Sequence, residues 1–351
     1  MRMKNTNFCP NFQIITKKNK KTLKKIAVVI LNWNGVQLLE QFLPSVIQYS
    51  AEADIYIADN ASTDDSISFV EQHFPTVKIV KNTGNYGFAK GYNEALQHID
   101  AELYALVNSD IEVTENWLNP ILETFEKESK TAIIQPKLLD FKNKEYFEYA
   151  GAAGGFLDKY GYPYCRGRIF ETIEKDNGQY NDSCEITWAS GACFFIRSKV
   201  YHELKGFDGD FFAHQEEIDL CWRAKNRGYT IKYNPNSVVY HVGGATLQQG
   251  NPKKTFLNFR NSLLMLVKNL PKENLYSVLF TRMLLDGVAG IHFILQGKFI
   301  HCIAILKAHF SFYRLFSNTY KKRDFFQSKE YYKLKSIVIT YYVKNGKVFA
   351  K

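Results

Sequence analysis

Residues 105–113 read ALVNSDIEV, an apolar run that stops on Asn108, Ser109 and Asp110. A short apolar run bounded by polar residues is typical of a buried strand. A carboxylate at the end of such a strand can bind a divalent cation through hard oxygen ligands. Asp after a strand is also common in turns that have no function. The stretch therefore predicts a strand, and its neighbours decide whether a site follows it.

Strands alternate with helices on both sides of this stretch. The strands are predicted at 26–31, 55–58, 77–80 and 103–107, and the helices at 36–49, 65–73 and 89–99. This alternation predicts an α/β fold with a mostly parallel central sheet and helices on both faces. From residue 255 onward the chain is poor in strands, and amphipathic helices are predicted at 256–269, 275–296 and 299–315.

Polar clusters follow three of the four strands. They are Asn32 with Asn34, Asp59 with Asn60 and Asp64, and Asn108 with Asp110. Ligands of such sheets lie beyond the carboxyl ends of the strands, so the clusters are expected to converge on one edge. There Asp59 is placed to hydrogen-bond a base or a ribose.

The glycine-rich loop at 82–91 matches neither GxGxxG nor a P-loop. A diphosphate at this edge would therefore need a metal ion, and Asp110 is the candidate ligand.

Residues 211–223, FFAHQEEIDLCWR, place Glu216 and Glu217 at the start of a predicted helix and Asp219 in its first turn. Acids favour a helix N-terminus, and Asp219 can pair with Arg223 at i,i+4 spacing. The functional alternative makes one of the three carboxylates a general base.

Two aromatic side chains are also candidates. His241 ends a β-like run before Gly243 and Gly244, and it is either structural or part of a site. Trp188 is either part of a site or a residue of the core.

Charge is unevenly distributed along the chain. Residues 1–25 carry eight Lys and Arg and no acid, residues 26–250 carry 19 basic and 31 acidic side chains, and residues 251–351 carry 18 and 4. An acidic body with basic ends argues against a nucleic-acid binder and favours docking on an anionic membrane surface. Asp286 and Lys298 interrupt the apolar stretch 283–306, so this region is predicted to lie on the membrane rather than span it. A homodimer interface is the alternative for 251–351.

The six cysteines show no metal-binding spacing, and no signal-peptide pattern opens the chain. Both observations predict reduced thiols in the cytoplasm.

The order of the motifs resembles the inverting family-2 glycosyltransferases of GT-A fold, in particular bacterial rhamnosyltransferase-like members. The resemblance covers residues 26–245 and rests on NWNG (32–35), IADNASTD (57–64), NTGNYGFAKGYN (82–93), LVNSD (106–110), WASGACFFIR (188–197), GFDGDFFAHQEEIDLCWR (206–223) and YHVGG (240–244). It implies a GT-A domain at 26–250. The regions outside it are a basic tail (1–25) and a basic, aromatic-rich helical region (251–351), which from its charge and composition is expected to associate with membrane or to dimerise.

The resemblance also implies an activity. A sugar would pass from a nucleotide-diphospho-sugar, dTDP-rhamnose or a UDP-hexose, to a hydroxyl of a glycan or of a lipid-linked precursor, at the inner face of the cytoplasmic membrane. Glu217 matches the catalytic base, Asp110 and His241 match the positions that hold Mg or Mn, and Asp59 matches the contact to the base of the nucleotide. The other expected donor contacts are Asn32, Asn34, Asn60, Asp64, Gly87, Asn93, Asn108, Gly191 and Ala192, and the expected acceptor contacts or secondary acids are Trp188, Glu216 and Asp219.

Two departures from the family pattern leave alternatives open. The metal motif is Asn-Ser-Asp, with one carboxylate, and the base is Glu rather than Asp, so that its role can shift to Glu216 or Asp219. The alternative functions are a non-catalytic sugar-nucleotide-binding protein and a component of a polysaccharide synthase.

Overall fold

The computed structural model describes residues 25–243 and 250–349. The predicted basic tail, apart from Lys25, and Gly244 lie outside the described residues. The first half of the chain confirms the predicted alternation of strands and helices. Its elements are β1 (Ile26–Asn32), α1 (Val36–Gln48), β2 (Ala53–Asp59), α2 (Ser66–His73), β3 (Lys78–Lys81), α3 (Gly87–Ala95), the 3₁₀ turn η1 (Leu96–His98) and β4 (Leu103–Asn108).

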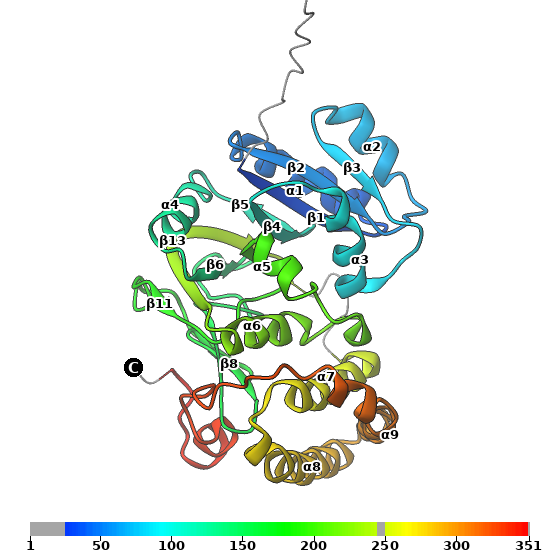
Figure 1. The fold of residues 1–351 in the computed structure, drawn as a ribbon, viewed down its shortest axis with the longest axis vertical. Coiled ribbons are helices and arrows are strands. Elements are labelled where there is room, and N and C mark those ends of the chain that lie inside the picture. Colours follow the sequence, from blue (N-terminus) through cyan, green and yellow to red (C-terminus); the bar gives the residue numbers. More distant parts are fainter. Residues whose placement is uncertain (1–24, 244–249, 350–351) are drawn as a thin grey trace, which may run out of the picture.

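A nine-stranded sheet forms the centre of the molecule (Figure 1). Its order is β11-β13-β6-β12-β4-β1-β2-β3, and β5 pairs with β13. The remaining strands are β5 (Ile111–Val113), β6 (Thr131–Asp140), β11 (Cys184–Glu185), β12 (Cys193–Arg197) and β13 (Thr230–His241). Strands β1 to β4, β6 and β13 run in one direction, and β12 runs antiparallel between β4 and β6. The predicted, mostly parallel sheet is confirmed.

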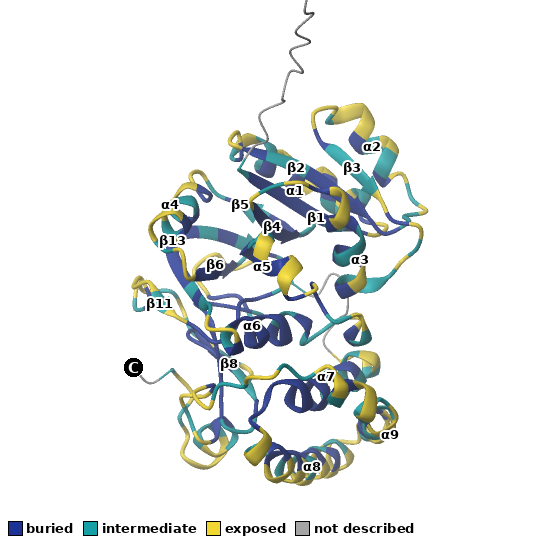
Figure 2. Ribbon diagram, viewed as in Figure 1, coloured by how far each residue is buried: buried dark blue, intermediate teal, exposed yellow. Residues whose placement is uncertain are grey.

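Alternating side chains of the central strands supply two cores. Ile26, Val28 and Ile30 pack with apolar residues of α1, α2 and α4 (Asn119–Lys127) on one face. Ala27 and Val29 pack on the other face with residues of α3, α5 (Ser198–Glu203) and α6 (Glu216–Asn226). Because both faces are covered, the strands are buried almost throughout (Figure 2), as expected for parallel strands.

The predicted C-terminal helices are also confirmed, as α7 (Pro252–Asn269), α8 (Lys272–Leu295) and α9 (Phe299–Lys321). Residues Leu263 to Val267 of α7 are fully buried in the same core as α6, so α7 is part of the body rather than a detached appendage. Smaller elements complete the fold. They are β7 (Gly155–Leu157), β8 (Pro163–Cys165), β9 (Arg168–Ile169), β10 (Thr172–Ile173), the 3₁₀ turn η2 (Gly209–Phe211) and a π-helical turn (Ile339–Val343).

Among the described residues, α8 is the one helix long and apolar enough to cross a membrane. The sequence predicted no such segment, because the stretch considered began at residue 283 and ran into Lys298. The helix begins eleven residues earlier, at Lys272. Two charged residues in the middle of the helix, Arg282 and Asp286, are buried against the protein. The helix therefore meets the criteria for a membrane span by length and composition only.

Candidate active site

The predicted polar clusters do meet at one edge of the sheet. Asn32 pairs with Asp59 at the ends of β1 and β2, and Leu31 pairs with Asn108 at the end of β4. On the far side, the N–H of Asn108 donates to the carbonyl of Ala192, just before β12 (2.9 Å). His241 ends β13 opposite Ile111. We call the strand ends that carry Asn32, Asp59, Asp110 and His241 the donor edge.

Asp110, His241 and Glu148 form a buried chain of charged groups. Nε2 of His241 lies 3.1 Å from Oδ1 of Asp110, and Nδ1 lies 3.1 Å from Oε1 of Glu148. The other oxygen of Glu148 accepts the N–H groups of Ala150 (2.6 Å) and Gly151 (3.1 Å). Burial alone would lower the pKa of His241, but the two carboxylates outweigh it and raise that pKa to about 10. Glu148 thus lies at ion-pair distance from the ring, although Nδ1 of His241 makes no hydrogen bond within the described structure.

The donor set fits a hard divalent cation once His241 has released the proton that Asp110 and Glu148 favour, because only the neutral imidazole can bind a metal ion. Two ligands in adjacent positions of an octahedral ion, each about 2.1 Å from it, lie roughly 3 Å apart, and Asp110 Oδ1 and His241 Nε2 are 3.1 Å apart. A carboxylate that holds the second ring nitrogen is the usual support of a metal-binding histidine. The described residues include no cluster of three or more ligands. The remaining positions would therefore fall to water and phosphate oxygens, as is common for Mg²⁺.

Asp59 is buried and already hydrogen-bonded within the donor edge. One carboxylate oxygen accepts the N–H of Ser62 (2.9 Å), and the other accepts the hydroxyl of Ser62 and Nδ2 of Asn32 (3.3 Å). Oδ1 of Asn32 is buried and has no partner in the described structure. This unpaired oxygen can accept a hydrogen bond from a ligand that binds at the edge.

Asp64 and Asn34 hold the loops around this edge. Oδ2 of Asp64 accepts the N–H of Val36 at the start of α1 (3.1 Å), and Oδ1 accepts the N–H of Ser66 at the start of α2 (3.1 Å). Oδ1 of Asn34 accepts the N–H of Thr63 (2.7 Å). Asp64 therefore serves the two helix starts and Asn34 holds the loop before α2, and a direct contact of either to a nucleotide stays a prediction.

Asn60, Gly87 and Asn93 hold the 82–93 loop in place. The amide of Asn60 donates to the carbonyl of Gly87 (2.9 Å). Gly87 has φ +70°, and a Cβ there would lie 2.7 Å from the ring of Phe212. The amide of Asn93 donates to the carbonyl of Phe207 (2.8 Å) and accepts the hydroxyl of Tyr201 (2.7 Å). These contacts join the loop to residues 207–212. The predicted contacts of Asn60, Gly87 and Asn93 to a nucleotide-sugar are untested.

Glu217 lies beside the segment that leads into β12. A Cβ built on Gly191 would lie 3.8 Å from both Cβ and Cδ of Glu217. Oε2 of Glu217 is buried and has no hydrogen-bond partner in the described structure. Gly191 thus lies beside Glu217, and the next residue, Ala192, accepts the hydrogen bond from Asn108 at the donor edge.

The two glutamates at the start of α6 differ in pKa. Burial raises the pKa of Glu217 to about 7, although backbone N–H groups counteract the rise. Burial and the neighbouring charge of Glu217 raise the pKa of Glu216 well above its usual range. A carboxyl with a pKa near the working pH is suited to general base catalysis. Of the two, Glu217 fits that role.

The turn before α6 is strained and is held by α7. Phe212, His214 and Gln215 have φ of +64°, +69° and +74°, a region that non-glycine residues rarely adopt. Strain of this kind persists only where the surroundings enforce it. The buried amide of Asn261 donates to the carbonyls of Phe211 (3.0 Å), Ala213 (2.9 Å) and His214 (2.7 Å). We call residues 208–217 the base loop, because they position Glu217.

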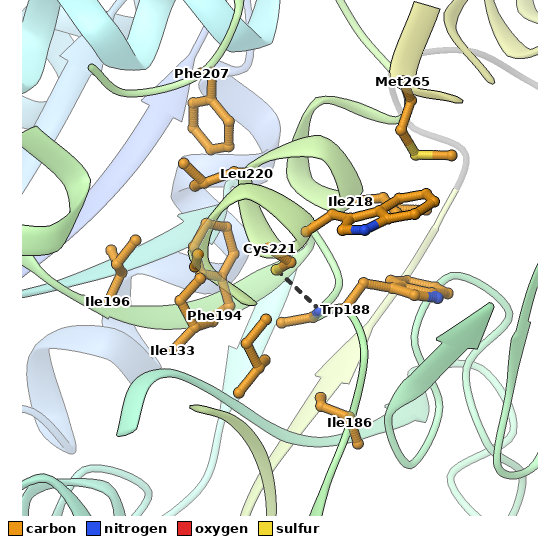
Figure 3. Close-up of a cluster of buried hydrophobic side chains, with 14 of the residues drawn as sticks. Ile133, Ile186, Trp188, Phe194, Ile196, Phe207, Ile218, Leu220, Cys221 and Met265 are labelled. Atoms are coloured by element: carbon orange, nitrogen blue, oxygen red, sulfur yellow. Dashed lines mark hydrogen bonds between the residues drawn. The ribbon is translucent and has the colours of Figure 1, made fainter. Parts of the chain in front are cut away.

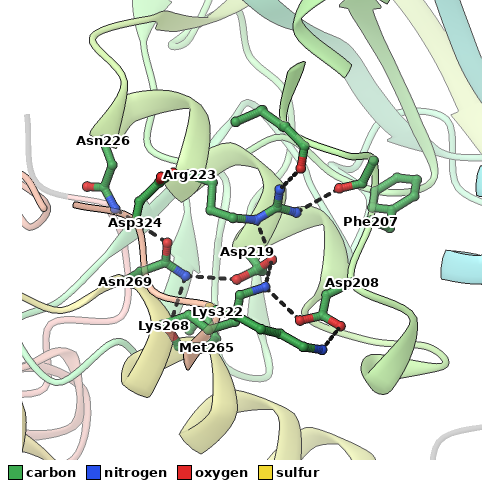
Figure 4. A network of polar contacts seen from close by, with 12 residues as sticks. Phe207, Asp208, Asp219, Arg223, Asn226, Met265, Lys268, Asn269, Lys322 and Asp324 are labelled. Atoms are coloured by element: carbon green, nitrogen blue, oxygen red, sulfur yellow. Dashed lines mark hydrogen bonds and ion pairs between the residues drawn. The ribbon is translucent and has the colours of Figure 1, made fainter. Parts of the chain in front are cut away.

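Asp219 does not qualify as the base. It is fully buried, and its Oδ2 lies 2.8 Å from both Arg223 Nε and Lys268 Nζ, while Oδ1 accepts from the amide of Asn269 (2.8 Å). Lys268 also pairs with Asp208 (2.8 Å). Figure 4 shows this network between α6 and α7. The expectation that Asp219 serves as a secondary acid is therefore corrected, and the alternative of an Asp219–Arg223 pair holds, because both carboxylate oxygens are already engaged.

Trp188 belongs to the core. It is 2% exposed, and its Nε1 donates to the carbonyl of Phe156 (2.9 Å). Figure 3 shows it among Ile186, Ile218 and Met265. No ring face is left for a sugar, so the expected acceptor contact is corrected in favour of the packing alternative.

The sequence reasoning missed two residues of this arrangement. Glu148 follows the end of β6, where the pattern of the sequence is irregular, and its partner His241 is 93 positions away. Asn261 lies inside an amphipathic helix, where a single Asn carries no signal. The carboxylate before the glycine-rich stretch 151–155 was the only available hint of Glu148.

Comparisons with known proteins agree with this geometry. A family model described as Glycosyl transferase family 2 matches residues 27–205, just over half of the chain. The N-acetylglucosaminyl-diphospho-decaprenol L-rhamnosyltransferase of Mycobacterium tuberculosis is 21% identical over 231 residues, which are 62% of this chain and 75% of that protein. The low-salt glycan biosynthesis hexosyltransferase Agl10 of Haloferax volcanii is 21% identical over 252 residues, 69% of this chain and 75% of its own.

Solved structures share the fold. GalNAc-T7 with UDP, GalNAc and Mn²⁺ superposes with a TM-score of 0.55 at 16% identity, over 72% of this chain and 49% of that one. S. aureus TarS 1–349 with UDP-GlcNAc gives 0.54 at 13% identity, over 85% and 84%. The mannosyltransferase PcManGT from Pyrobaculum calidifontis with GDP-Man and Mn²⁺ gives 0.50 at 13% identity, over 84% and 88%. The match thus spans about half of the GalNAc-T7 chain and most of the other two.

Proposed function

This chain belongs to glycosyl transferase family 2, and from that membership we propose that it transfers a sugar from a nucleotide-diphospho-sugar to a hydroxyl group with inversion at the anomeric carbon. The proposed acceptor is a cell-surface glycan or a lipid-linked oligosaccharide precursor. The predicted class of enzyme, a glycosyltransferase, agrees with the family and with the named relatives.

One observation carries the proposal. A metal-compatible pair, Asp110 and His241, lies at the sheet edge, and an unpaired carboxylate oxygen on Glu217 of α6 lies beside Gly191. The next residue, Ala192, accepts a hydrogen bond from Asn108 of that edge. A leaving diphosphate and an attacking hydroxyl need these two kinds of group on opposite sides of the anomeric carbon.

In the proposed mechanism, Glu217 accepts the proton of the acceptor hydroxyl. The hydroxyl oxygen forms a new bond to the anomeric carbon while the bond from that carbon to the diphosphate oxygen breaks. The nucleoside diphosphate leaves with the bonding electrons, and the glycoside has the opposite anomeric configuration. Glu217 then loses its proton to solvent.

Asp110 and His241 would hold a divalent cation, Mg or Mn, with Glu148 orienting the imidazole. When bound, such an ion neutralises charge on a diphosphate. Asp59 and the free oxygen of Asn32 would bind the nucleoside, since both lie on adjacent strand ends of the same edge.

For the donor we propose dTDP-rhamnose or a UDP-hexose. The rhamnosyltransferase of M. tuberculosis supports the first choice and the wording of its name, which includes a diphospho-decaprenol, supports a lipid-linked acceptor. Such an acceptor would place the enzyme at the inner face of the cytoplasmic membrane, which the basic residues of 251–351 also favour.

Calorimetric titration of UDP-, dTDP- and GDP-sugars, with and without Mn²⁺, tests the proposal on the wild type and on Asp110→Asn. We expect one nucleotide class to bind in a metal-dependent manner and the mutant to lose that dependence. Binding of none of them would contradict the donor proposal. A sugar that is bound but never transferred to a hydroxyl acceptor would instead favour a non-catalytic binding role.

A further inference from the structure

Helices α8 and α9 present a large apolar surface to solvent. On α8 the exposed side chains recur every three or four residues, which places them on one side of the helix. The same holds for α9. The exposed apolar residues are Tyr276, Phe280, Leu284, Val288, Ile291, Ile294 and Leu295 of α8, and Phe299, Ile300, Ile303, Leu306, Phe310 and Tyr313 of α9. We call this set the outer face. Figure 2 shows both helices at one end of the molecule, away from the sheet.

The outer face is far more apolar than a solvated helix surface. Phe280, Ile300 and Phe310 are 65%, 64% and 68% exposed, and Leu295 reaches 81%. From Tyr276 to Leu295 the face runs for roughly 28 Å along α8, at 1.5 Å per residue. Exposed apolar patches of this extent mark an interaction site.

Charges around the outer face are mostly positive. Between residues 274 and 323 the only acid is Asp286, which is buried and faces His309 (3.1 Å) and Arg282. Lys307 and Arg314 of α9 are exposed, as is Lys298 between the two helices. The exposed acid at the start of α8, Glu273, pairs with Lys329 (2.8 Å). An apolar face with a mostly cationic border fits the surface of a bilayer with anionic headgroups.

The tip of the helix pair lies near the base loop. Thr255 of α7 hydrogen-bonds His301 at the start of α9 (2.7 Å), and Lys253 of α7 lies over the ring of Phe212 (5.0 Å). Phe212 in turn belongs to the base loop, which leads to Glu217. Two short steps therefore connect the apolar tip, with Leu295, Phe299 and Ile300, to the catalytic side of the molecule.

We propose that the outer face docks on an anionic bilayer and that its tip, residues 295–301, enters the interface beside the base loop, so that a membrane-bound hydroxyl acceptor reaches Glu217. The acceptor part of this inference rests on the proposed function, whereas the docking part does not. Arg282 and Asp286 are buried in the protein, so the helices lie along the surface rather than cross it.

Co-sedimentation with vesicles tests the docking. The full-length protein is mixed with phosphatidylglycerol-containing vesicles and with phosphatidylcholine vesicles, and the bound fraction is measured against salt. We expect binding to the anionic vesicles that weakens with salt, and a loss of at least roughly tenfold in affinity for the double variant Phe280→Glu/Ile300→Glu. Because both side chains are mostly exposed, thermal unfolding should be unchanged. Ile173→Glu, at an exposed isoleucine of β10, is the matched control and should bind as the wild type does.

Two results would overturn the proposal. One is the absence of vesicle binding by the wild type at low salt. The other is a concentration-dependent dimer that the double variant dissociates, since a second copy would then cover the outer face. Calorimetric donor binding, measured in parallel, separates this inference from the proposed function. Lost donor binding with intact vesicle binding would refute only the function, and the reverse would refute only the docking.

Discussion

The donor edge and the base loop use different means to hold their polar groups. At the donor edge, neighbouring strands and the loops that follow them hold one another, as Asn32 does with Asp59 and Asn34 does with Thr63. The base loop is strained and depends on Asn261 and Lys268 of α7. The family model covers residues 27–205, which include most of the donor edge and none of the base loop or α7.

This difference has a functional meaning. All nucleotide-diphospho-sugars contain a nucleotide and a diphosphate, so one arrangement of strand ends can bind different members of this class. The proposed base must instead meet the proposed acceptor, and the loop that carries it is held by α7, a helix outside the matched region. Variants on the two sides should therefore separate donor binding from transfer.

The largest effect is expected for Glu217→Gln. Transfer should fall by about 10²- to 10⁴-fold, the usual contribution of a general base, while donor affinity stays unchanged. Rates measured with saturating donor, together with calorimetry, test this. Glu216→Gln is the paired variant, and a smaller loss is expected because burial and the charge of Glu217 raise the pKa of Glu216 well above its usual range. An equal loss in both variants would remove the distinction between the two residues.

Glu148→Gln should weaken metal binding by about 10- to 100-fold, because the ring of His241 would lose the carboxylate that orients it. Titration of Mn²⁺ in the presence of the nucleoside diphosphate measures this. Glu123→Gln, at a surface ion pair on α4, is the control. Unchanged Mn²⁺ affinity in Glu148→Gln would show that the donor edge does not need this support.

Asn261→Ala should lower kcat by about tenfold or more and leave the dissociation constant of the donor unchanged, because a small displacement of the base is costly. It should also reduce the free energy of unfolding by about 1–3 kcal/mol, since three carbonyls lose their donor. Asn119→Ala, at an exposed asparagine of α4, serves as the control. If Asn261→Ala instead weakened the binding of the nucleotide-sugar, the base loop would contribute to donor binding rather than to transfer alone.

The pH dependence of transfer should report Glu217. Its pKa of about 7 lies above the ordinary value, so the rate should rise about tenfold per pH unit below pH 7 and level off above it. The sign for stability is opposite. The folded state favours the protonated form, so the wild type should lose stability relative to Glu217→Gln as pH rises from about 4.5 to 7, by about 3 kcal/mol. A flat rate profile from pH 5.5 to 8.5 would argue against this base.

The smallest functional effect is expected for Asp64→Ala. Its oxygens accept N–H groups at the starts of α1 and α2, so unfolding should cost about 1 kcal/mol less while donor affinity changes by less than about twofold. Chemical denaturation and calorimetry measure the two quantities. A large loss of donor affinity would return Asp64 to the binding residues.

Local patterns in the sequence were sufficient to predict the strands and helices of the donor edge. β1 and β4 are continuous apolar runs that end on polar residues, and α7 to α9 keep a helical period. β6 escaped prediction because Gln135, Pro136 and Lys137 interrupt its apolar pattern, although all of Thr131–Leu139 is buried. Gln135 is satisfied by carbonyls of residues 151 and 152, and Lys137 by Asp176 and Asn181. These partners are distant in sequence.

The site shows the same limit. Asp110, His241 and Glu217 follow from motifs; the structure brings Asp110 and His241 into contact and places Glu217 beside Gly191. Asp219 is engaged by Lys268, and Trp188 bonds the carbonyl of Phe156. No spacing in the sequence predicts either contact, so the roles of these two residues could not be predicted. Each of these roles is decided by a contact partner rather than by the residue itself.

The Lys268 bridge limits how this enzyme can be recombined with its relatives. Lys268 neutralises two buried carboxylates, Asp208 and Asp219, which belong to the part of the chain before α7. A chimaera that exchanges the C-terminal helices at residue 250 without supplying a cation here would leave buried negative charge, at a cost of about 3–5 kcal/mol. A working hybrid must therefore take Asp208, Asp219 and Lys268 from the same parent, wherever the junction between the two sequences is placed.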